Sequence, residues 1–568
     1  MKKVILLIVA VAMLVALPLS SVLAYEAFIG PTEVVQYDAD KAYNGYTLFS
    51  PFNQLDPWYT YLIDMEGNRI HTWQRPYGMG LHARLLENGN LIRGGRPQVA
   101  NDADTYKVLS FGGVGGVVDI LDWDSNLVDQ IAYYSADYRQ HHDFRKIHNP
   151  TLGEDTYMLM VSNRKTKEDC EAIGGVTDYL KADNDMWSVD GIVELTATSP
   201  HKVIWKWCFY EHTCQSEDPG KSNYRADISA HPEKFAVNWE IPNKNRGPSV
   251  DWLHCNSFDY NEALDQIVIN AKNMSTIVVI DHGGTFVENE LVPGTEAAKP
   301  AGDFLYRFGN PSYYDRGAAP GYMDTGEQQL WGSHNIQWIR PVAYTGGPAL
   351  PGAGNFTIMD NGCYTPMGFH SKIFEWNGFL DADGVSQYPN YVDPPAAGYF
   401  DERGRGAKTN ISNQVVWSYR SVLLNSFYGA YISGTQRLPN GNTFICSGPT
   451  GHLFEVTPGE KSATTNMWGG REVVWEYNSP VARGIHTTQT DANSGLFAIF
   501  RALRYGPDYP GLAGKTLTPQ GTLTGRIPGT VDVYPPVVPI TGWGIPPGTS
   551  SEGGAGAGGG GGGGGGGY

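Results

Sequence analysis

The chain has 568 residues and a formal net charge of −18 at neutral pH. It contains 70 Gly, 36 Pro and 33 Tyr, a composition that favours β structure and turns over long helices. The negative charge argues against nucleic acid or anionic lipid as a partner, so any anion-binding site must be a local cluster of positive groups.

Residues 1–24 have the features of a signal peptide. Two lysines precede an apolar run from Val4 to Leu19, and small residues before Tyr25 form a cleavage site. A retained membrane anchor is the alternative, but the apolar run is short for one. We therefore expect export to the periplasm or the cell exterior, with no membrane span in the mature protein.

A recurring pattern of short strands runs through residues 25–511. Leu81–Gly94 and Ser433–Ser447 each place Asn-Gly-Asn between an extended lead-in and a short apolar strand. Asn-Gly is typical of two-residue hairpin turns of type I′, which need positive φ at both central residues. Both segments are therefore predicted to be β-hairpins.

Looser copies of this hairpin begin at His142, His254 and His334, and the segment 495–504 supplies a further unit. Each copy continues into strands with an acidic or aromatic pattern, so the unit contains about four strands in a fixed order, as in a β-propeller. Neighbouring sheets of a propeller cover each other's faces. We predict an all-β, six-bladed β-propeller, with seven blades as the alternative. The strand at 45–50 should join the last blade and close the ring.

Two longer stretches, 163–188 and 208–248, exceed the length of turns within a blade. We expect them to extend over one face of the propeller, where long loops often shape a substrate site.

The chain has six cysteines, and an exported protein can form disulfides. Cys208 and Cys214 are the pair expected first, because they are close in sequence and flank a polar bend. The cysteine spacing is not typical of a zinc site.

Residues 512–568 differ in composition from the rest of the chain. They are rich in Pro, Gly and Thr and end in ten consecutive glycines, 558–567. Such a segment cannot bury enough apolar surface to offset its ordering entropy, so it is predicted to be disordered. A spacer and a cell-surface tether are both compatible with this composition.

Four histidines, His82, His142, His254 and His334, stand at one position of the repeat, before or at the start of the inner hairpin. Equivalent positions of a propeller face one another across its axis, so the four imidazoles are predicted to converge. A structural role, with each ring bonded to a loop carbonyl, is one alternative. A metal site is another. No His-x-His or His-x-x-x-His pair is present, however, and we predict neither metal nor other cofactor.

Positive groups recur beside these histidines. Arg164 and Lys272 each follow the second strand of their blade and can point at the same central site. Imidazoles, amides and cations gathered in a dry cavity suit a tetrahedral oxyanion such as sulfate or phosphate. An uncharged histidine is also a competent nucleophile for such a centre.

Three blocks of sequence resemble the bacterial arylsulfate sulfotransferases. Asp251–Ser257 looks like the Asp-Trp-x-His-x-Asn signature of that family. Residues 332–334 together with 357–362 resemble the next block, and His141–Asp143 resembles an earlier one. The blocks occur in the order of the family, and the resemblance spans 40–512.

This resemblance implies a six-bladed propeller that moves a sulfuryl group from an aryl sulfate to a phenol through a sulfo-histidine, without a nucleotide donor. His334 matches the nucleophile. His254 and Asn256 match groups that hold the sulfuryl oxygens, and His254 can also protonate the leaving phenolate. His142 matches another oxygen contact. Lys272 stands where the family has an arginine. The lysine keeps the positive charge but lacks the bidentate donor geometry of a guanidinium, which puts transfer efficiency or acceptor range in doubt.

A covalent intermediate predicts ping-pong kinetics, and the absence of a Gly-x-x-x-x-Gly-Lys segment agrees with a donor that is not a nucleotide. Two other functions stay open: a sulfatase or phosphoesterase with water as acceptor, and a non-catalytic binding propeller. The propeller strands begin soon after the signal peptide, so the small N-terminal β domain of the enterobacterial members is expected to be absent or reduced. Its loss puts the dimer contacts of those enzymes in doubt, and the sequence leaves the oligomeric state open, a homodimer included.

Overall fold

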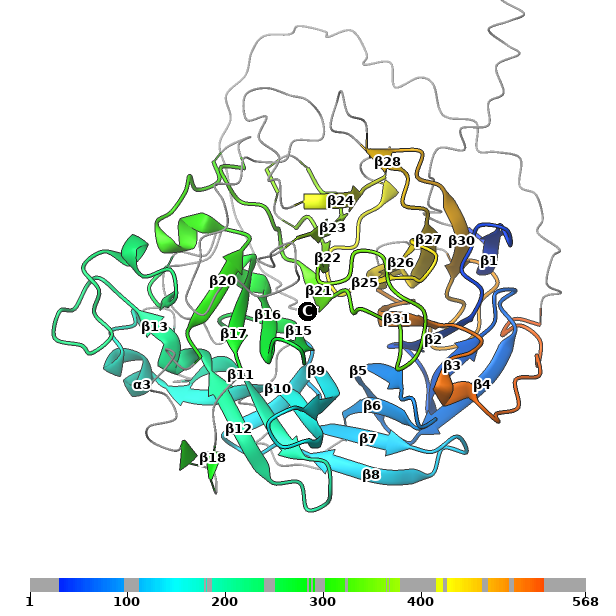
Figure 1. Cartoon of the computed structure of the whole chain (residues 1–568), viewed down its shortest axis with the longest axis horizontal. Helices are drawn as coiled ribbons and strands as arrows, with labels where there is room; N and C mark the ends of the chain where they lie inside the picture. The colour runs from blue at the N-terminus through cyan, green and yellow to red at the C-terminus, as the bar shows by residue number, and fades with distance from the viewer. Residues whose placement is uncertain are drawn as a thin grey trace, which may run out of the picture.

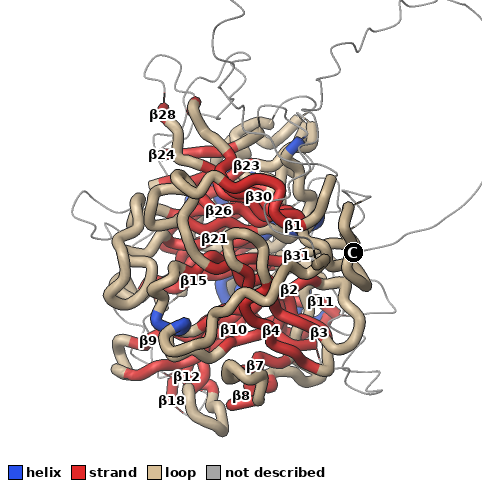
Figure 2. Tube along the Cα trace, turned by 90° about the vertical axis from the view of Figure 1, so that its right-hand side faces the viewer, coloured by secondary structure: helices blue, strands red, loops and turns tan. Residues whose placement is uncertain are grey.

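Six antiparallel sheets surround a common axis in the computed structural model (Figure 1). Each sheet runs from an inner strand near the axis to an outer strand at the rim, so the predicted six-bladed β-propeller is confirmed. In a view turned by 90°, strands dominate and the helices are short (Figure 2). The structure describes residues 30–96, 112–177, 180, 186–239, 251–282, 286–287, 290–291, 302–321, 325–363, 365–366, 368–377, 415–421, 426–461, 468–489 and 495–525.

The first five blades are meanders that follow one another along the chain, each beginning at the axis. From the axis outward, blade one contains β5 (Gly78–Leu85), β6 (Leu91–Arg96), β7 (Val117–Leu121) and β8 (Leu127–Ala132), and blade two contains β9 (Tyr138–Asn149), β10 (Glu154–Thr166), β11 (Met186–Thr196) and β12 (Val203–Cys208). Blade three contains β15 (Cys255–Asn261), β16 (Gln266–Ala271), β17 (Thr276–Asp281) and β20 (Phe304–Phe308), and blade four contains β21 (His334–Trp338), β22 (Phe356–Asp360), β23 (Lys372–Trp376) and β24 (Val415–Tyr419). Blade five contains β25 (Gly434–Arg437), β26 (Thr443–Ser447), β27 (His452–Val456) and β30 (Val473–Asn478).

The sixth blade joins two distant parts of the chain. Its inner strand β31 (Ile499–Tyr505) pairs with β2 (Tyr46–Pro51), as the sequence predicts, and β3 (Trp58–Ile63) and β4 (Arg69–Arg75) complete the sheet. The early strand β1 (Glu33–Tyr37) adds a fifth strand to blade five beside β30. The ring is therefore closed by backbone hydrogen bonds, and opening it would expose both unpaired strand edges.

Shorter elements lie outside the blades. In the stretch after β10, the helix α3 (Lys167–Ala172) begins with a capping box between Thr166 and Asp169 and buries Cys170. The remaining short elements are β13 (Thr213–Cys214), β14 (Phe235–Ala236), β18 (Phe286–Val287), β19 (Glu290–Leu291), β28 (Glu460–Lys461), β29 (Trp468–Gly469), and the 3-10 turns η1 (Phe209–His212), η2 (Ile228–Ala230), η3 (Lys272–Met274), η4 (Pro311–Tyr314), η6 (Gly448–Thr450) and η7 (Pro510–Leu512).

The two Asn-Gly-Asn hairpins form as predicted, but with a different turn. Gly89 has φ of +86° and donates to the carbonyl of Leu86, while Asn88 is not among the residues with positive φ. The turn is therefore a type I turn followed by a left-handed glycine, not a type I′ turn. The Asn88 side chain explains the choice, because its Oδ1 accepts from the N–H of Asn90 at 3.1 Å and stabilises the wider loop. The hairpin at Gly441 is built in the same way.

The hydrophobic core lies between neighbouring blades rather than in one central mass. Between blades three and four, Trp376 is completely buried and its ring centroid lies 4.9 Å from that of Phe308. Trp73, Trp187, Trp252 and Trp475 are also fully buried. Aromatic side chains of this size bury more apolar surface than any others, so the blade interfaces hold the ring together.

Side-chain bonds also link the inner strands around the axis. The inner strands of blades two to five offer polar side chains to backbone N–H groups of the next blade, which fixes the height of these blades relative to one another. The acceptor and donor pairs are Asp143 and Phe258 (3.3 Å), Ser257 and Ile336 (3.0 Å), Asp259 and Trp338 (3.0 Å), Asn335 and Thr435 (2.9 Å), and Gln436 and Arg504 (2.8 Å).

The folded domain extends beyond the boundary predicted at residue 511. The backbone of Arg69 bonds to both Gln520 and Gly521, each at 2.9 Å, and Thr524 donates to the Glu33 carboxylate. Residues up to 525 therefore pack on β4 and β1. The rest of the predicted tail and the predicted signal peptide lie outside the described residues. Within the described ranges, no helix is both long and apolar enough to cross a membrane.

The predicted disulfide between Cys208 and Cys214 is not formed. Both are free thiols, as are the other four cysteines. Cys208 ends the outer strand β12, where Asn163 donates to its Sγ at 3.6 Å. Cys214 lies beyond η1 in β13, which pairs with β14. The intervening turn thus places the two residues on separate strands.

Candidate active site

The inner strands are bulged at one level along the axis. His142, His254, Asn335 and Ile432 have φ between 47° and 60°, a left-handed conformation that is uncommon outside glycine. The strand register shifts near the bulges of β9, β15 and β21. Bulges re-aim side chains and are frequent next to active sites. The repetition of this device around the ring indicates a level built to present side chains to the axis.

His334 is held in one tautomer. The amide nitrogen of Asn361 donates to the carbonyls of Gly429 and Ile432, at 2.6 and 2.9 Å. Asn361 Oδ1 therefore faces His334 Nδ1, 2.7 Å away, and accepts its proton. The lone pair lies on Nε2, to which the Ile432 N–H donates at 3.2 Å. Burial, followed by the charge of Lys272, holds the pKa of His334 well below its usual value, so the ring is neutral at pH 7.

His254 is paired with a carboxylate. Its Nδ1 lies 2.6 Å from Asp251 Oδ2, and since a carboxylate only accepts, Nδ1 carries a proton. The ring meets that of His142 edge to face, with 4.8 Å between centroids. The charge of His254 also contributes to lowering the pKa of His334, so the three rings share one electrostatic environment.

His142 ends a chain of three buried groups. His141 Nε2 lies 3.1 Å from Asp190 Oδ1. The Nδ1 atoms of His141 and His142 lie 2.7 Å apart and share one hydrogen bond. Burial, followed by the charge of His254, lowers the pKa of His142 well below its usual value, so this ring is neutral at neutral pH.

Asn256 is fully buried beside the residue that precedes His334. Its Nδ2 donates to the carbonyl of Ser333 at 2.8 Å, and its Oδ1 accepts from Asn270 at 2.8 Å. Asn270 also bonds to Ser333 through both side-chain and backbone atoms. One of the two amide hydrogens of Asn256 is thus committed to holding the His334 loop.

Lys272 starts the 3-10 turn η3 directly after β16. Its positive charge is the second cause, after burial, of the lowered pKa of His334, and it acts in the same direction on Cys363. Lys272 therefore belongs to the surroundings of His334, as the sequence predicts from its place in the blade. A single ammonium group takes the place of the planar guanidinium expected from the family resemblance.

A buried ion pair supports the site from below. Arg501 Nη1 donates to Asp143 Oδ2 at 2.8 Å, and Arg501 Nη2 donates to the carbonyl of Asn256 at 3.0 Å. Asp143 Oδ1 lies 3.0 Å from His82 Nε2. Although burial alone would raise it, the positive charge of Arg501 holds the pKa of Asp143 well below the usual range. His82 is thereby occupied by Asp143, which agrees with a structural role for this histidine.

Phe500 lies among the histidines. Its ring centroid is 6.0 Å from those of His82 and His142 and 6.4 Å from that of His334. The four histidines of the repeat thus converge as their spacing predicts. We call the group formed by His142, His254, His334 and Lys272 the histidine site. His82 belongs to its support.

Sequence reasoning missed Phe500, Arg501, Asn361 and the Ile432 N–H. Phe500 and Arg501 lie in the segment 495–504, which was recognised as the last unit of the ring. Phe500 and Arg501 occupy the position in the last inner strand that corresponds to the histidines of the other blades. This correspondence is the signal in the sequence that could have located them. A backbone N–H such as that of Ile432 has no sequence signal at all. Among the described residues, no three His, Cys, Asp or Glu side chains are placed to hold a metal ion.

Solved structures with a similar chain path include a Bacteroides caccae protein of unknown function (10% identity, 81% of this chain and 98% of that one, TM-score 0.33). Another is the Pseudomonas aeruginosa periplasmic gluconolactonase (8% identity, 78% of this chain and 98% of that one, TM-score 0.29). No curated protein matches the chain. The family described as arylsulfotransferase (ASST) matches residues 32–368, more than half of the sequence. The chain therefore belongs to the arylsulfotransferase family.

Proposed function

We propose that this protein transfers a sulfuryl group from an aryl sulfate ester to a phenol through a covalent sulfo-His334 intermediate. The observation that carries the proposal is the state of His334. Asn361 keeps the proton on Nδ1, and burial beside Lys272 keeps the ring neutral, so Nε2 presents a lone pair at neutral pH. A neutral imidazole with a fixed tautomer is a nucleophile that needs no separate base.

In the first half-reaction, His334 Nε2 attacks sulfur, and the bond between sulfur and the phenolic oxygen breaks. The leaving phenolate takes a proton from His254, whose Nδ1 is oriented by the carboxylate of Asp251. Lys272 neutralises the charge spread over the sulfuryl oxygens, as cations do in phosphoryl transfer. The Ile432 N–H is released from Nε2 during the attack and can donate to a sulfuryl oxygen.

Asn361 keeps the intermediate reactive. Its neutral amide accepts the Nδ1 proton of His334 but cannot remove it. The sulfo-imidazole ring therefore stays positively charged, which makes it a good leaving group. In the second half-reaction the acceptor oxygen attacks sulfur, the N–S bond breaks, and the electron pair returns to Nε2. The phenol proton passes to His254 and restores its starting state.

His142 is proposed to contact a substrate oxygen beside His254. The two rings meet edge to face, with 4.8 Å between their centroids, so they belong to one binding site.

Acceptor dependence tests the proposed function. We expect an added phenol to accelerate release of 4-nitrophenol from 4-nitrophenyl sulfate and to be recovered as its own sulfate ester. Ping-pong kinetics should give parallel lines in double-reciprocal plots. Release that is unchanged by added phenol, with inorganic sulfate as the product, would instead identify a sulfatase. The absence of any turnover would favour a binding propeller.

Replacing Lys272 with methionine is expected to lower kcat/KM by about a hundredfold, the typical loss for one oxyanion-stabilising donor. It should also move the acid limb of the pH profile. Lys272 lowers the pKa of His334, so loss of the charge raises this pKa and activity is lost at a higher pH than in the wild type. Lys272→Arg keeps the charge and provides the matched control. An unshifted acid limb in Lys272→Met would contradict this electrostatic role.

A further inference from the structure

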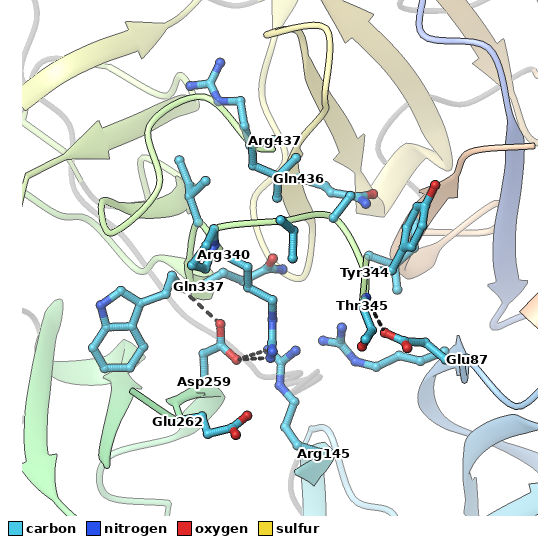
Figure 3. Close-up of a pocket in the computed structure, with 18 of the residues that line it drawn as sticks. Glu87, Arg145, Asp259, Glu262, Gln337, Arg340, Tyr344, Thr345, Gln436 and Arg437 are labelled. Carbon is cyan, nitrogen blue, oxygen red and sulfur yellow. Dashed lines mark hydrogen bonds and ion pairs between the residues drawn. The ribbon is translucent and has the colours of Figure 1, made fainter. Parts of the chain in front are cut away.

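A cavity opens at the end of the propeller axis opposite to the histidine site. Its volume is about 1120 Å³, and the far ends of the inner strands line it. Arg84, Arg145, Asp259 and Gln337 follow the site histidines along β5, β9, β15 and β21, and none of the four repeat histidines lines this cavity. Figure 3 shows Arg145 and Arg340 directed at Asp259 on its wall. The two ends of the axis thus carry separate sites.

Arg84 is an unpaired cation in this cavity. Its Nε and Nη2 atoms are buried without a hydrogen-bond partner among the described residues. Burial, followed by the charge of Arg145, lowers the pKa of Arg84 to about 9, which leaves the guanidinium charged at neutral pH. Buried cations in proteins are normally paired, because desolvation of an unpaired charge is strongly unfavourable. Arg84 therefore has the properties of a group that awaits an anion.

The other cations of the cavity wall are already paired. Arg145 Nη2 lies 3.5 Å and Arg340 Nη2 lies 3.4 Å from Asp259 Oδ1, and Lys146 Nζ lies 2.6 Å from Asp155 Oδ2. Arg84, in contrast, has no carboxylate within ion-pair distance among the described residues. A protein with a net charge of −18 attracts anions only through such local groups.

A long loop covers the mouth of the cavity. The other inner hairpins close in short turns, whereas residues 339–355 between β21 and β22 reach across to blade one. The Thr345 N–H donates to Glu87 Oε1 at 3.0 Å (Figure 3). Tyr344 meets Tyr509 edge to face at 5.5 Å. The loop thus contributes aromatic and apolar surface to the cavity that Arg84 also lines.

We infer that this cavity binds a small organic anion, whose carboxylate, sulfate or phosphate group pairs with Arg84 and whose apolar body lies against the tyrosines of the mouth. A planar guanidinium with open donors suits a bidentate bond to such an oxyanion. The site is independent of sulfuryl transfer at His334, since it shares none of the reactive residues.

Calorimetric titration of the full chain with benzenesulfonate tests the site. The titration is made in the Lys272→Met background, which weakens binding at the histidine site. Adding Arg84→Met is expected to weaken the remaining binding by roughly ten- to a hundredfold, the effect of losing charge-assisted hydrogen bonds. Lys146→Met removes the same charge from the same wall, but from a paired residue, and should change affinity by less than about twofold. Equal affinity with and without Arg84 would overturn the inference.

Thermal unfolding separates a binding role from a structural one. An unpaired buried charge opposes folding, so Arg84→Met without ligand should melt at or above the temperature of the parent protein. Benzenesulfonate should raise the melting temperature of the parent and leave that of Arg84→Met unchanged. A variant that melts below the parent, or fails to fold, would show that Arg84 supports the fold and would equally overturn the inference.

Discussion

Replacing His334 with alanine is expected to lower kcat by a factor on the order of 10⁴ or more, because loss of the covalent nucleophile removes the reaction path rather than one stabilising contact. Intact-mass measurement after mixing with an aryl sulfate should show one added sulfo group on the wild type and none on His334→Ala. The fold should be retained, since Asn361 keeps its two bonds to backbone carbonyls without the imidazole.

The matched control for this experiment is His254→Gln. This variant keeps the nucleophile and loses the group that protonates the leaving phenolate. It should still form the adduct from 4-nitrophenyl sulfate, whose phenolate leaves without a proton, and should fail with esters of more basic phenols. An adduct that persists in His334→Ala would assign the nucleophile to another ring. Peptide mapping would then distinguish His142 from His254, the other two histidines of the histidine site.

The propeller could be predicted because the sequence patterns that indicate each blade lie within one short segment of the chain. Each blade is a meander of consecutive strands, so the hairpins at Gly89 and Gly441 and the loose copies at the histidines each report on one sheet. The turn type could not be predicted from Asn-Gly alone. Asn88 bonds to the backbone two residues on and favours a wider loop, and this competition between side-chain and backbone bonds is not visible in a dipeptide pattern.

The site was predictable only in part for the same reason. The recurrence of histidine at one repeat position, with the family resemblance, located His142, His254 and His334. The partners that set their chemistry come from other blades. Arg501 and Asp143 are separated by 358 residues, and the Ile432 N–H bonds to a ring on the preceding blade. Such contacts depend on how the blades close into a ring, and no single segment encodes them.

Asp143→Asn is expected to lower the free energy of unfolding by about 3–5 kcal/mol, the usual result of removing one partner of a buried ion pair. In the wild type, this carboxylate lies on β9 and accepts bonds from His82 on β5, the Phe258 N–H on β15 and Arg501 on β31. It therefore joins four blades at the axis. The asparagine cannot balance the charge of Arg501, which stays buried against Phe500. Urea unfolding followed by tryptophan fluorescence measures the loss.

Asp155→Asn is the control, because Asp155 pairs with Lys146 at a half-exposed position and should cost about 1 kcal/mol or less. Equal losses in the two variants would show that the buried pair is not a support of the ring. The pH dependence gives an independent check. The pKa of Asp143 is lower in the folded chain than in the unfolded one, so its stabilising effect is present at neutral pH and is lost as the pH falls through the folded pKa. The free energy of unfolding should therefore fall less between neutral and acidic pH in Asp143→Asn than in the wild type. The variant lacks the carboxylate that takes up a proton when the wild type unfolds.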